Sequence, residues 1–328
     1  MKRRALVGVI QGAAAWLLIV SAIPAQAQTP GRVYRLGHIS NSAISDANTR
    51  KIILPELAKL GFVEGRNLVF DGRVGELDSQ TSLMRELLAT KPDVVIAVGP
   101  ALAAVGAATR TVPIVSFGRD PIELGLARSY ARLGGNVTGV VILISELEVK
   151  RLSILHEVAP DRQRVAVLVS SAASSGPTAV GEAALRKAAA GLGIELLAFP
   201  VAAPADYPAA FAAMRAADAQ ALVISATSEF YRDGKQLAAL ALEARLPTVC
   251  EWADMAHAGC LIGYGPDRTA LRLRMAAQIA QIFRGTAPGD IAIELPTAFE
   301  LAVNQKIAKS LDLSIPLSVL AGASEVIE

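Results

Sequence analysis

The chain has 328 residues, of which 19% are charged and 52% hydrophobic, and its formal net charge is +2. Lys2, Arg3 and Arg4 precede Gln28 and no acidic residue does, so the rest of the chain keeps 29 of the 32 basic side chains against 30 acidic ones and is close to neutral. This balance, together with an aromatic content of 5%, excludes a polyanion-binding surface and extended stacking on bases, so no nucleic-acid partner is expected.

The N-terminus has the pattern of a secretory signal. Basic residues 2–4 precede an apolar span at 13–23, and Ala25 and Ala27 are the small residues at −3 and −1 of a cleavage site. The apolar span is about half the length of a stable membrane helix. We therefore predict a cleaved signal peptide at residues 1–27 and a mature protein outside the cytoplasm; the alternative is an uncleaved anchor.

Strand-length apolar runs alternate with helical periods along the first half. Strands are predicted at residues 33–39, 67–71, 93–98 and 113–117, and helices at 51–60, 79–90 and 101–110. The continuous apolar run at 93–98 is typical of a parallel strand that is buried on both faces.

The same plan restarts in the second half. Strands are predicted at 164–169, 194–200, 221–225 and 247–251, and helices at 181–192, 209–217 and 236–245. The tail is less regular, with a strand at 260–264, a helix at 270–283 and an extended segment at 291–295. Two βα series predict an α/β protein with two Rossmann-like lobes, each built on a parallel sheet.

The arginines at the start of the predicted helix 270–283 require an interpretation. Arg268, Arg272 and Arg274 are interpreted as a solvated face rather than as a ligand clamp. Leu271, Met275, Ile279 and Ile282 are expected to form the buried side of this helix.

Ligands of open parallel sheets bind beyond the carboxyl ends of the strands. The residues there are mostly short hydroxyls, amides and glycines, which suit a small anion because free N–H groups at helix starts point towards the ligand. The alternative for each loop is ordinary N-capping. The candidate ligand-binding residues are Asn41, Ser42, Gly99, Pro100, Ala101, Arg119, Asp120, Ser171, Ser174, Thr227, Ser228, Glu251, Trp252 and Tyr264.

Four of these candidates carry a more specific hypothesis. Asp120 and Glu251 follow strands at positions where they could pair a cation such as an α-ammonium group, although Asp120 before Pro121 also suits a turn. Trp252 and Tyr264 either stack on a flat ligand or pack at a hinge.

The sequence nominates no catalytic, metal or cofactor site. It has no GxSxG elbow, no Walker lysine and no GxGxxG fingerprint, and its three histidines are far apart. We therefore predict a protein that is not an enzyme and that has no metal and no cofactor. Cys250 and Cys260 are either a disulfide or two buried thiols, since an oxidising compartment permits a bridge but the spacing does not require one.

Several segments, in order, resemble a known family. They are residues 61–67 (GFVEGRN), 120–121 with 124–126 (DP, LGL), 134–139 (GGNVTG), 150–152 with 164–169 (KRL, RVAVLV), 264–265 (YG), and 296–301 (PTAFEL) with 304–306 (NQK) and 308–309 (AK). The chain resembles the periplasmic substrate-binding components of ABC transporters of the tryptophan/tyrosine type. Arg119 stands where many relatives have a small residue, and its guanidinium could pair a carboxylate.

The resemblance implies a type I periplasmic-binding-protein fold in which three crossings join the two lobes. The crossings are expected near Val140, Ala253 and Ile291, which gives lobe one residues 32–140 and 253–289 and lobe two residues 141–252 and 290–328. The implied function is that of a monomer that traps a small organic solute by hinge closure and delivers it to an ABC permease. The solute would be an aromatic or branched amino acid or an aromatic carboxylate. Alternatives are a protein that presents ligand to a membrane receptor, and a secreted enzyme on the same scaffold.

Overall fold

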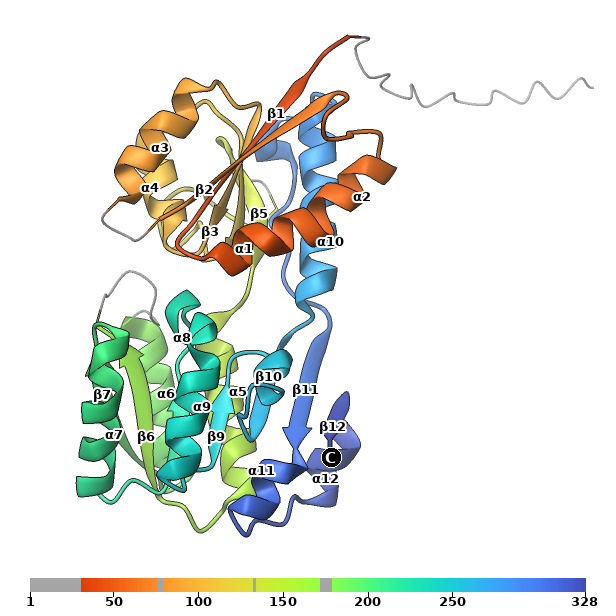
Figure 1. Ribbon diagram of the computed structural model, residues 1–328. Coiled ribbons are helices and arrows are strands. Elements are labelled where there is room, and N and C mark those ends of the chain that lie inside the picture. The colour runs from red at the N-terminus through yellow and green to blue at the C-terminus, as the bar shows by residue number, and fades with distance from the viewer. Residues whose placement is uncertain (1–30, 76–78, 132–133, 172–178) are drawn as a thin grey trace, which may run out of the picture.

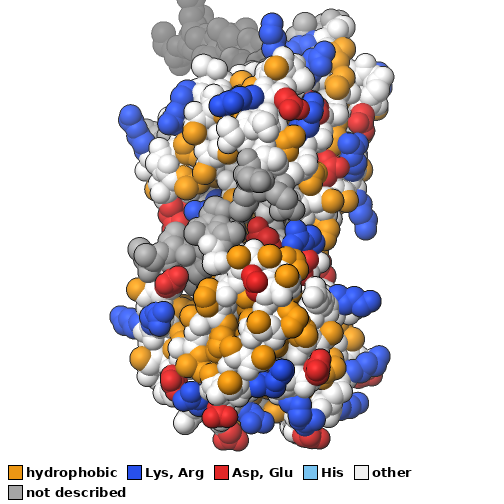
Figure 2. Space-filling model, turned by 60° about the vertical axis from the view of Figure 1, so that its left-hand side comes forward, with side chains coloured by type: hydrophobic (Ala, Val, Ile, Leu, Met, Phe, Trp, Pro, Cys, Tyr) orange, Lys and Arg blue, Asp and Glu red, His pale blue; other side chains and the backbone are white. Residues whose placement is uncertain are grey.

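The computed structural model describes residues 31–75, 79–131, 134–171 and 179–328. The signal peptide predicted at 1–27 and the candidate Ser174 therefore lie outside the described residues. The described chain forms two lobes, one above the other in Figure 1, and the same two masses are visible in the space-filling view of Figure 2. Among the described helices, none is both long enough and apolar enough to cross a membrane.

Lobe one contains a five-stranded sheet in the order β2-β1-β3-β4-β5, and every pair in it is parallel. Its strands are Tyr34–Ser40 (β1), Leu68–Val74 (β2), Val94–Val98 (β3), Ile114–Gly118 (β4) and Val137–Val141 (β5). Two helices, Gln80–Ala89 (α3) and Ala101–Ala108 (α4), lie together on one side of the sheet (Figure 1). On the other side lie Ala43–Asn48 (α1), a π-helical segment at Thr49–Ile53, Leu54–Lys59 (α2) and Arg268–Phe283 (α10).

Lobe two contains a seven-stranded sheet in the order β12-β11-β10-β9-β8-β6-β7. Its strands are Arg164–Ser170 (β6), Glu195–Val201 (β7), Ala221–Ile224 (β8), Thr248–Cys250 (β9), Ile262–Pro266 (β10), Phe299–Asn304 (β11) and Glu325–Ile327 (β12). The strands β7-β6-β8-β9-β10 repeat the order of lobe one, and β11 then pairs with β10 in the antiparallel sense. The helices of this lobe are Ile144–Val158 (α5), Ala179–Gly191 (α6), Tyr207–Ala216 (α7), Ser228–Arg232 (α8), Gly234–Glu243 (α9), Gln305–Ser310 (α11) and Leu317–Gly322 (α12).

The chain changes lobes at three places. The first is the step from β5 to α5, where Leu143 takes the left-handed conformation with φ 59°. The second is Asp267, between β10 and α10. The third lies at residues 295–298, because Glu294 still pairs with Val140 of lobe one and β11 belongs to lobe two.

The second crossing differs from the expected position near Ala253. Residues 253–266 remain with lobe two, since β10 forms a ladder with both β9 and β11. The third crossing also comes after the expected Ile291, because the backbone of residues 293–294 is hydrogen-bonded beside β5. Lobe one thus comprises residues 31–141 and 268–294 of the described chain, which differs from the expected 32–140 and 253–289.

Helix α10 returns the chain to lobe one and completes its core. Met275 and Ile279 are buried against that lobe, as the helical period predicted. At the end of the helix, the ring of Phe283 lies 4.8 Å from that of Tyr34 and 4.9 Å from that of Phe62, measured between ring centroids. These aromatic contacts join the last part of lobe one to its first strand.

The predicted strands and helices are present, but strands β5, β11 and β12 and helices α1, α5, α8, α11 and α12 were not predicted. Gly134 and Gly135 precede β5 and Gly139 lies within it, so the sequence of this segment resembles a turn. Gly139 is needed within the strand, because a Cβ there would lie 2.2 Å from the backbone oxygen of Ser116 on β4, and because φ is +143°. The glycine therefore marks close approach of two strands.

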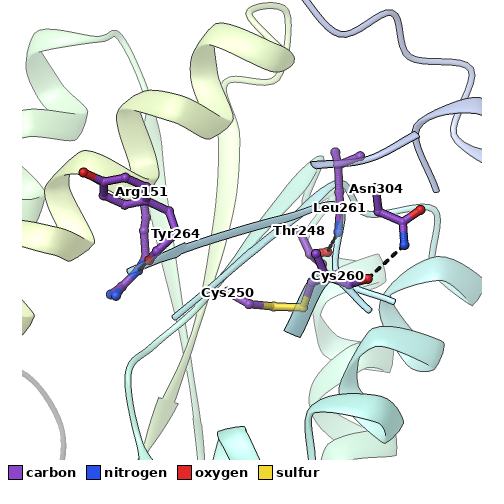
Figure 3. The surroundings of a disulfide bond; sticks show 8 residues. Arg151, Thr248, Cys250, Cys260, Leu261, Tyr264 and Asn304 are labelled. Atoms are coloured by element: carbon purple, nitrogen blue, oxygen red, sulfur yellow. Dashed lines mark hydrogen bonds between the residues drawn. A yellow bond between two sulfur atoms is a disulfide. The ribbon is translucent and has the colours of Figure 1, made fainter. Parts of the chain in front are cut away.

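Cys250 and Cys260 form a disulfide, which decides between the two alternatives left by their spacing (Figure 3). Their Cα atoms are 6.4 Å apart and both side chains are fully buried. Beside the bridge, the Leu261 N–H donates to the Thr248 hydroxyl, and the Asn304 side-chain amide donates to the Ala256 carbonyl. The bridge and these bonds fix the loop that carries Glu251 and Trp252.

Candidate ligand-binding site

A cleft of about 650 Å³ lies between the lobes. Lobe one contributes residues that follow β1, β3 and β4, together with the first turns of α10. Lobe two contributes the β8–α8 loop and the residues after β9. The lining residues are Ser42, Ile44, Ser45, Val98, Gly99, Pro100, Phe117, Gly118, Arg119, Ile142, Ile144, Ala226, Thr227, Ser228, Tyr231, Glu251, Trp252, Arg268 and Arg272.

Eight of the fourteen candidates lie in this cleft, because each follows the carboxyl end of a parallel strand. They are Ser42, Gly99, Pro100, Arg119, Thr227, Ser228, Glu251 and Trp252. Ligand binding by these residues stays a prediction. Thr227 also caps α8, since its hydroxyl accepts from the N–H of Phe230 at 3.1 Å.

Asn41 lies between the lobes without lining the cleft. Its side-chain amide donates to the carboxylate of Glu229 on α8 at 2.8 Å. This hydrogen bond joins a loop of lobe one directly to a helix of lobe two.

Four other described candidates lie elsewhere. Ala101 is fully buried in the core of lobe one. Ser171 is exposed, and its N–H donates to the carbonyl of Val201. The Tyr264 ring stacks on Phe299, with centroids 6.1 Å apart. Asp120 belongs to a neighbouring hollow beside the cleft, which has an empty volume of about 450 Å³.

The contacts of Asp120 are those of a turn residue. One carboxylate oxygen accepts from the N–H of Ile122 at 2.7 Å, and the other accepts from the hydroxyl of Tyr130 at 2.5 Å. The hydrogen bond to Asp120 is the main reason why the pKa of Tyr130 is raised to about 12. Of the two interpretations left open by the sequence, the structure favours the turn.

The two guanidinium groups of α10 that line the cleft were missed as site residues. Arg268 and Arg272 are four residues apart, so they share one side of the helix, and that side faces the cleft. Arg274 points away, with 64% of its side chain exposed. The interpretation as a solvated face is therefore wrong for the first two arginines and holds for the third.

Arg272 is a buried guanidinium. It is 5% exposed, it donates to the carbonyl of Arg268 at 3.2 Å, and its guanidinium lies 4.7 Å from the ring centroid of Phe117. Burial lowers its pKa to about 9, and the charge of Arg268 contributes in the same direction. Within the described chain, no carboxylate lies within ion-pair distance of Arg272, so its positive charge in the cleft is not neutralised by the protein at contact distance.

Arg268 is held in place by lobe two. It pairs with the carboxylate of Asp254 at 2.9 Å, and its guanidinium lies 4.2 Å from the ring centroid of Tyr231 and 4.9 Å from that of Trp252. The hydroxyl of Tyr231 donates to the same carboxylate. The start of α10 is thus fixed against the aromatic wall of the cleft.

Glu251 supplies the acidic group of the cleft. It is 7% exposed, and burial raises its pKa to about 7, although the charges of Arg151 and Arg268 oppose this. Arg151, which is fully buried, donates to the backbone carbonyls of Glu251 and Tyr264. Figure 3 shows Arg151 beside Tyr264. The backbone of Glu251 is therefore held in place by Arg151, and its carboxyl changes protonation near neutral pH.

Ser45 lies at the wall of the cleft in front of a buried histidine. His38 Nε2 is 3.3 Å from the Ser45 hydroxyl, and Nδ1 is 3.6 Å from the Asp46 carboxylate. Burial lowers the pKa of His38 to about 4. The imidazole is therefore neutral at pH 7 and a weak base, so this arrangement orients the hydroxyl of Ser45 and lacks the basicity that a nucleophilic triad needs.

A family model described as "ABC transporter substrate binding protein" matches residues 41–327. The chain belongs to this family. Among curated proteins, this substrate-binding protein is similar to the "Tyrosine-binding protein" of Clostridioides difficile, with 21% identity over 268 residues that cover 80% of this chain and 76% of that one.

Two solved structures share the fold. One is a conserved domain protein of Vibrio cholerae, with 24% identity and a TM-score of 0.81, covering 90% of this chain and 99% of that one. The other is an ABC domain from Streptococcus pneumonia in complex with L-Trp, with 21% identity, a TM-score of 0.80 and coverage of 90% and 100%. These likenesses establish the type I periplasmic-binding-protein fold for this substrate-binding protein.

Proposed function

We propose that the protein traps a small organic acid with an aromatic or branched apolar body between its lobes. The observation that carries this proposal is Arg272, whose buried guanidinium faces the cleft and has no carboxylate partner at contact distance among the described residues. A ligand carboxylate would pair this charge, and a guanidinium is suited to doing so through two parallel hydrogen bonds.

The walls of the cleft indicate the body of the ligand. Ile44, Val98, Phe117 and Ile142 offer apolar surface, and Trp252 offers an indole ring. The cleft has an empty volume of about 650 Å³, open solvent included, which leaves room for a small molecule. An aromatic or branched side chain therefore finds both the space and the surface that it needs.

Glu251 favours amino acids over plain carboxylates. An α-ammonium group beside this carboxyl would stabilise its charged form and bring its pKa down from about 7. The relatives support this choice, since one is named for tyrosine binding and another contains L-Trp. Aromatic carboxylates without an ammonium group are the alternative solutes.

We further propose that the protein works as a monomer in the periplasm and delivers its ligand to an ABC permease, without catalysis. A ligand that touches both lobes binds the closed form more tightly, and this difference shifts the population towards closure. The hydrogen bond between Asn41 and Glu229 is a contact that opening of the cleft would break. Delivery to a membrane receptor instead of a permease would use the same closure.

Isothermal titration calorimetry with a matched panel tests the proposal. L-tryptophan, L-tyrosine and L-leucine carry both charged groups, 3-indolepropionate lacks the ammonium group, and tryptamine lacks the carboxylate. We expect at least one amino acid to bind in the cleft, 3-indolepropionate to compete with it more weakly and tryptamine not to compete with it. Competition by tryptamine as strong as that by L-tryptophan would contradict the assignment of Arg272, and failure of the whole panel would contradict the ligand class.

A further inference from the structure

Lobe two contains a second cavity, open to solvent and separate from the interlobe cleft, with an empty volume of about 510 Å³ that includes open solvent. It lies between strands β6 and β7 and helix α6, and it reaches α5 and the end of β8. Its apolar walls are Val167, Val169, Leu185, Leu196 and Ala198. The exposed side chains of Glu182 and Arg186 on α6 form its rim.

Two buried polar side chains line this cavity without full hydrogen bonding. Glu148 is 1% exposed; its Oε1 accepts from the N–H of Ala226 at 3.2 Å, whereas Oε2 has no partner within the described structure. The hydroxyl of Ser225, 2% exposed, has none either. Buried polar atoms are rarely left unpaired, so two such atoms in one cavity indicate that a donor belongs between them.

The electrostatics of Glu148 favour a cationic donor. Burial raises the pKa of this carboxyl, and the charge of Arg151 and the bond from Ala226 offset the effect only in part. Ser225 is near enough to lower that pKa, yet no hydrogen bond of normal geometry joins the two groups. A cation placed between them would stabilise the carboxylate and hydrogen-bond to both oxygens.

We propose that this cavity is a binding site for a small primary amine with an apolar body. Its ammonium group donates to Glu148 Oε2 and to the Ser225 hydroxyl, and its hydrocarbon part packs against the five apolar walls. An anionic ligand is disfavoured, because it would meet Glu148 at the end of the cavity and Glu182 at the rim. The guanidinium of Arg186 is exposed at the same rim, where solvent screens its repulsion of an entering amine.

The test is a calorimetric titration of the whole protein with benzylamine, with benzyl alcohol as the uncharged match. In Glu148→Gln, the amide oxygen can still accept from Ala226 but the charge is lost, so benzylamine should bind about 10- to 100-fold more weakly. In Ala198→Trp, which fills the cavity from its exposed wall, binding should also be lost. Arg272→Met, a change in the interlobe cleft, should leave the dissociation constant for benzylamine within about twofold.

The controls separate this site from the cleft and from a cavity that holds water only. Benzyl alcohol should bind at least about tenfold more weakly than benzylamine, since it cannot pair with the carboxylate. No benzylamine binding to the parent protein, equal binding of the alcohol, or binding unchanged in both Glu148→Gln and Ala198→Trp would each overturn the proposal. None of these results depends on whether the panel of amino acids binds in the cleft.

Discussion

Arg272→Met should separate ligand binding from stability. Methionine keeps a long apolar side chain beside Phe117 and removes the charge that we assign to the ligand carboxylate. Removing one partner of a buried, hydrogen-bonded ion pair costs about 2–5 kcal/mol, which corresponds to a dissociation constant raised roughly 30- to 5,000-fold. Calorimetry with the amino acid that binds the parent protein measures this change.

The stability of the ligand-free protein should change in the opposite direction. The pKa of Arg272 is lowered to about 9, so its charged form is less favourable in the folded state than in the unfolded state, at every pH below that value. The decrease in the pKa of Arg272 corresponds to a cost of at most about 5 kcal/mol for keeping its charge in the folded protein. The interaction of the guanidinium with Phe117 offsets ~0.5–2 kcal/mol of this cost. Arg272→Met should therefore unfold at the same urea concentration as the parent protein, or at a higher one.

Arg274→Met is the matched control on the same helix. Its side chain is 64% exposed, and its distance of 3.5 Å to Glu294 is that of a surface ion pair, worth about 0–1 kcal/mol. It should leave both binding and stability nearly unchanged. If Arg272→Met destabilised the protein while the dissociation constant stayed at the parent value, Arg272 would be structural and the reasoning would be refuted.

Three further changes have definite outcomes. The folded pKa of Glu251 is about 7, above its ordinary value, so its contribution to stability is lost as pH rises between about 4.5 and 7. The free energy of unfolding of Glu251→Gln, measured in urea, should therefore increase relative to that of the parent by up to ~3 kcal/mol from pH 5 to pH 8. A difference that stays constant over this range would contradict the prediction. Asp120→Ala removes the acceptor of two hydrogen bonds, so it should lower the free energy of unfolding by about 1–3 kcal/mol and shift the pKa of Tyr130 down towards 10 in an ultraviolet titration. The affinity for the ligand should change little. A large loss of affinity with unchanged stability would instead make Asp120 a ligand-binding residue. Replacing Cys250 and Cys260 together by alanine should cost about 2–3 kcal/mol and lower Tm, and a parent Tm that does not respond to reductant would argue against the bridge.

The βα alternation was predictable because apolar runs and helical periods are local properties of the sequence. The rim residues were predictable in part, since parallel strands bring the residues at their carboxyl ends to one edge. Eight candidates reached the cleft by this rule. Ala101, by contrast, comes one residue after Pro100, at the start of α4, and its side chain is buried in the core of lobe one instead of lining the cleft.

The missed parts depend on contacts that sequence distance hides. Arg268 and Arg272 form a polar side of α10, and a polar side of a helix usually faces solvent. Here it faces the cleft, because the chain returns to lobe one at Asp267 after β10 has paired in lobe two. Two arginines four residues apart, directly after a strand end, were the available signal.

The return of α10 also governs how the molecule can be divided. A fragment that stops at residue 141 would contain every strand of lobe one, yet it would lack the helix that covers Tyr34 and Phe62. During synthesis, therefore, the core of lobe one is not complete until residues 268–283 have been made. Until then, a chaperone or the export machinery would encounter lobe one with the face that α10 covers exposed. A stand-alone version of lobe one needs α10 attached by a designed linker.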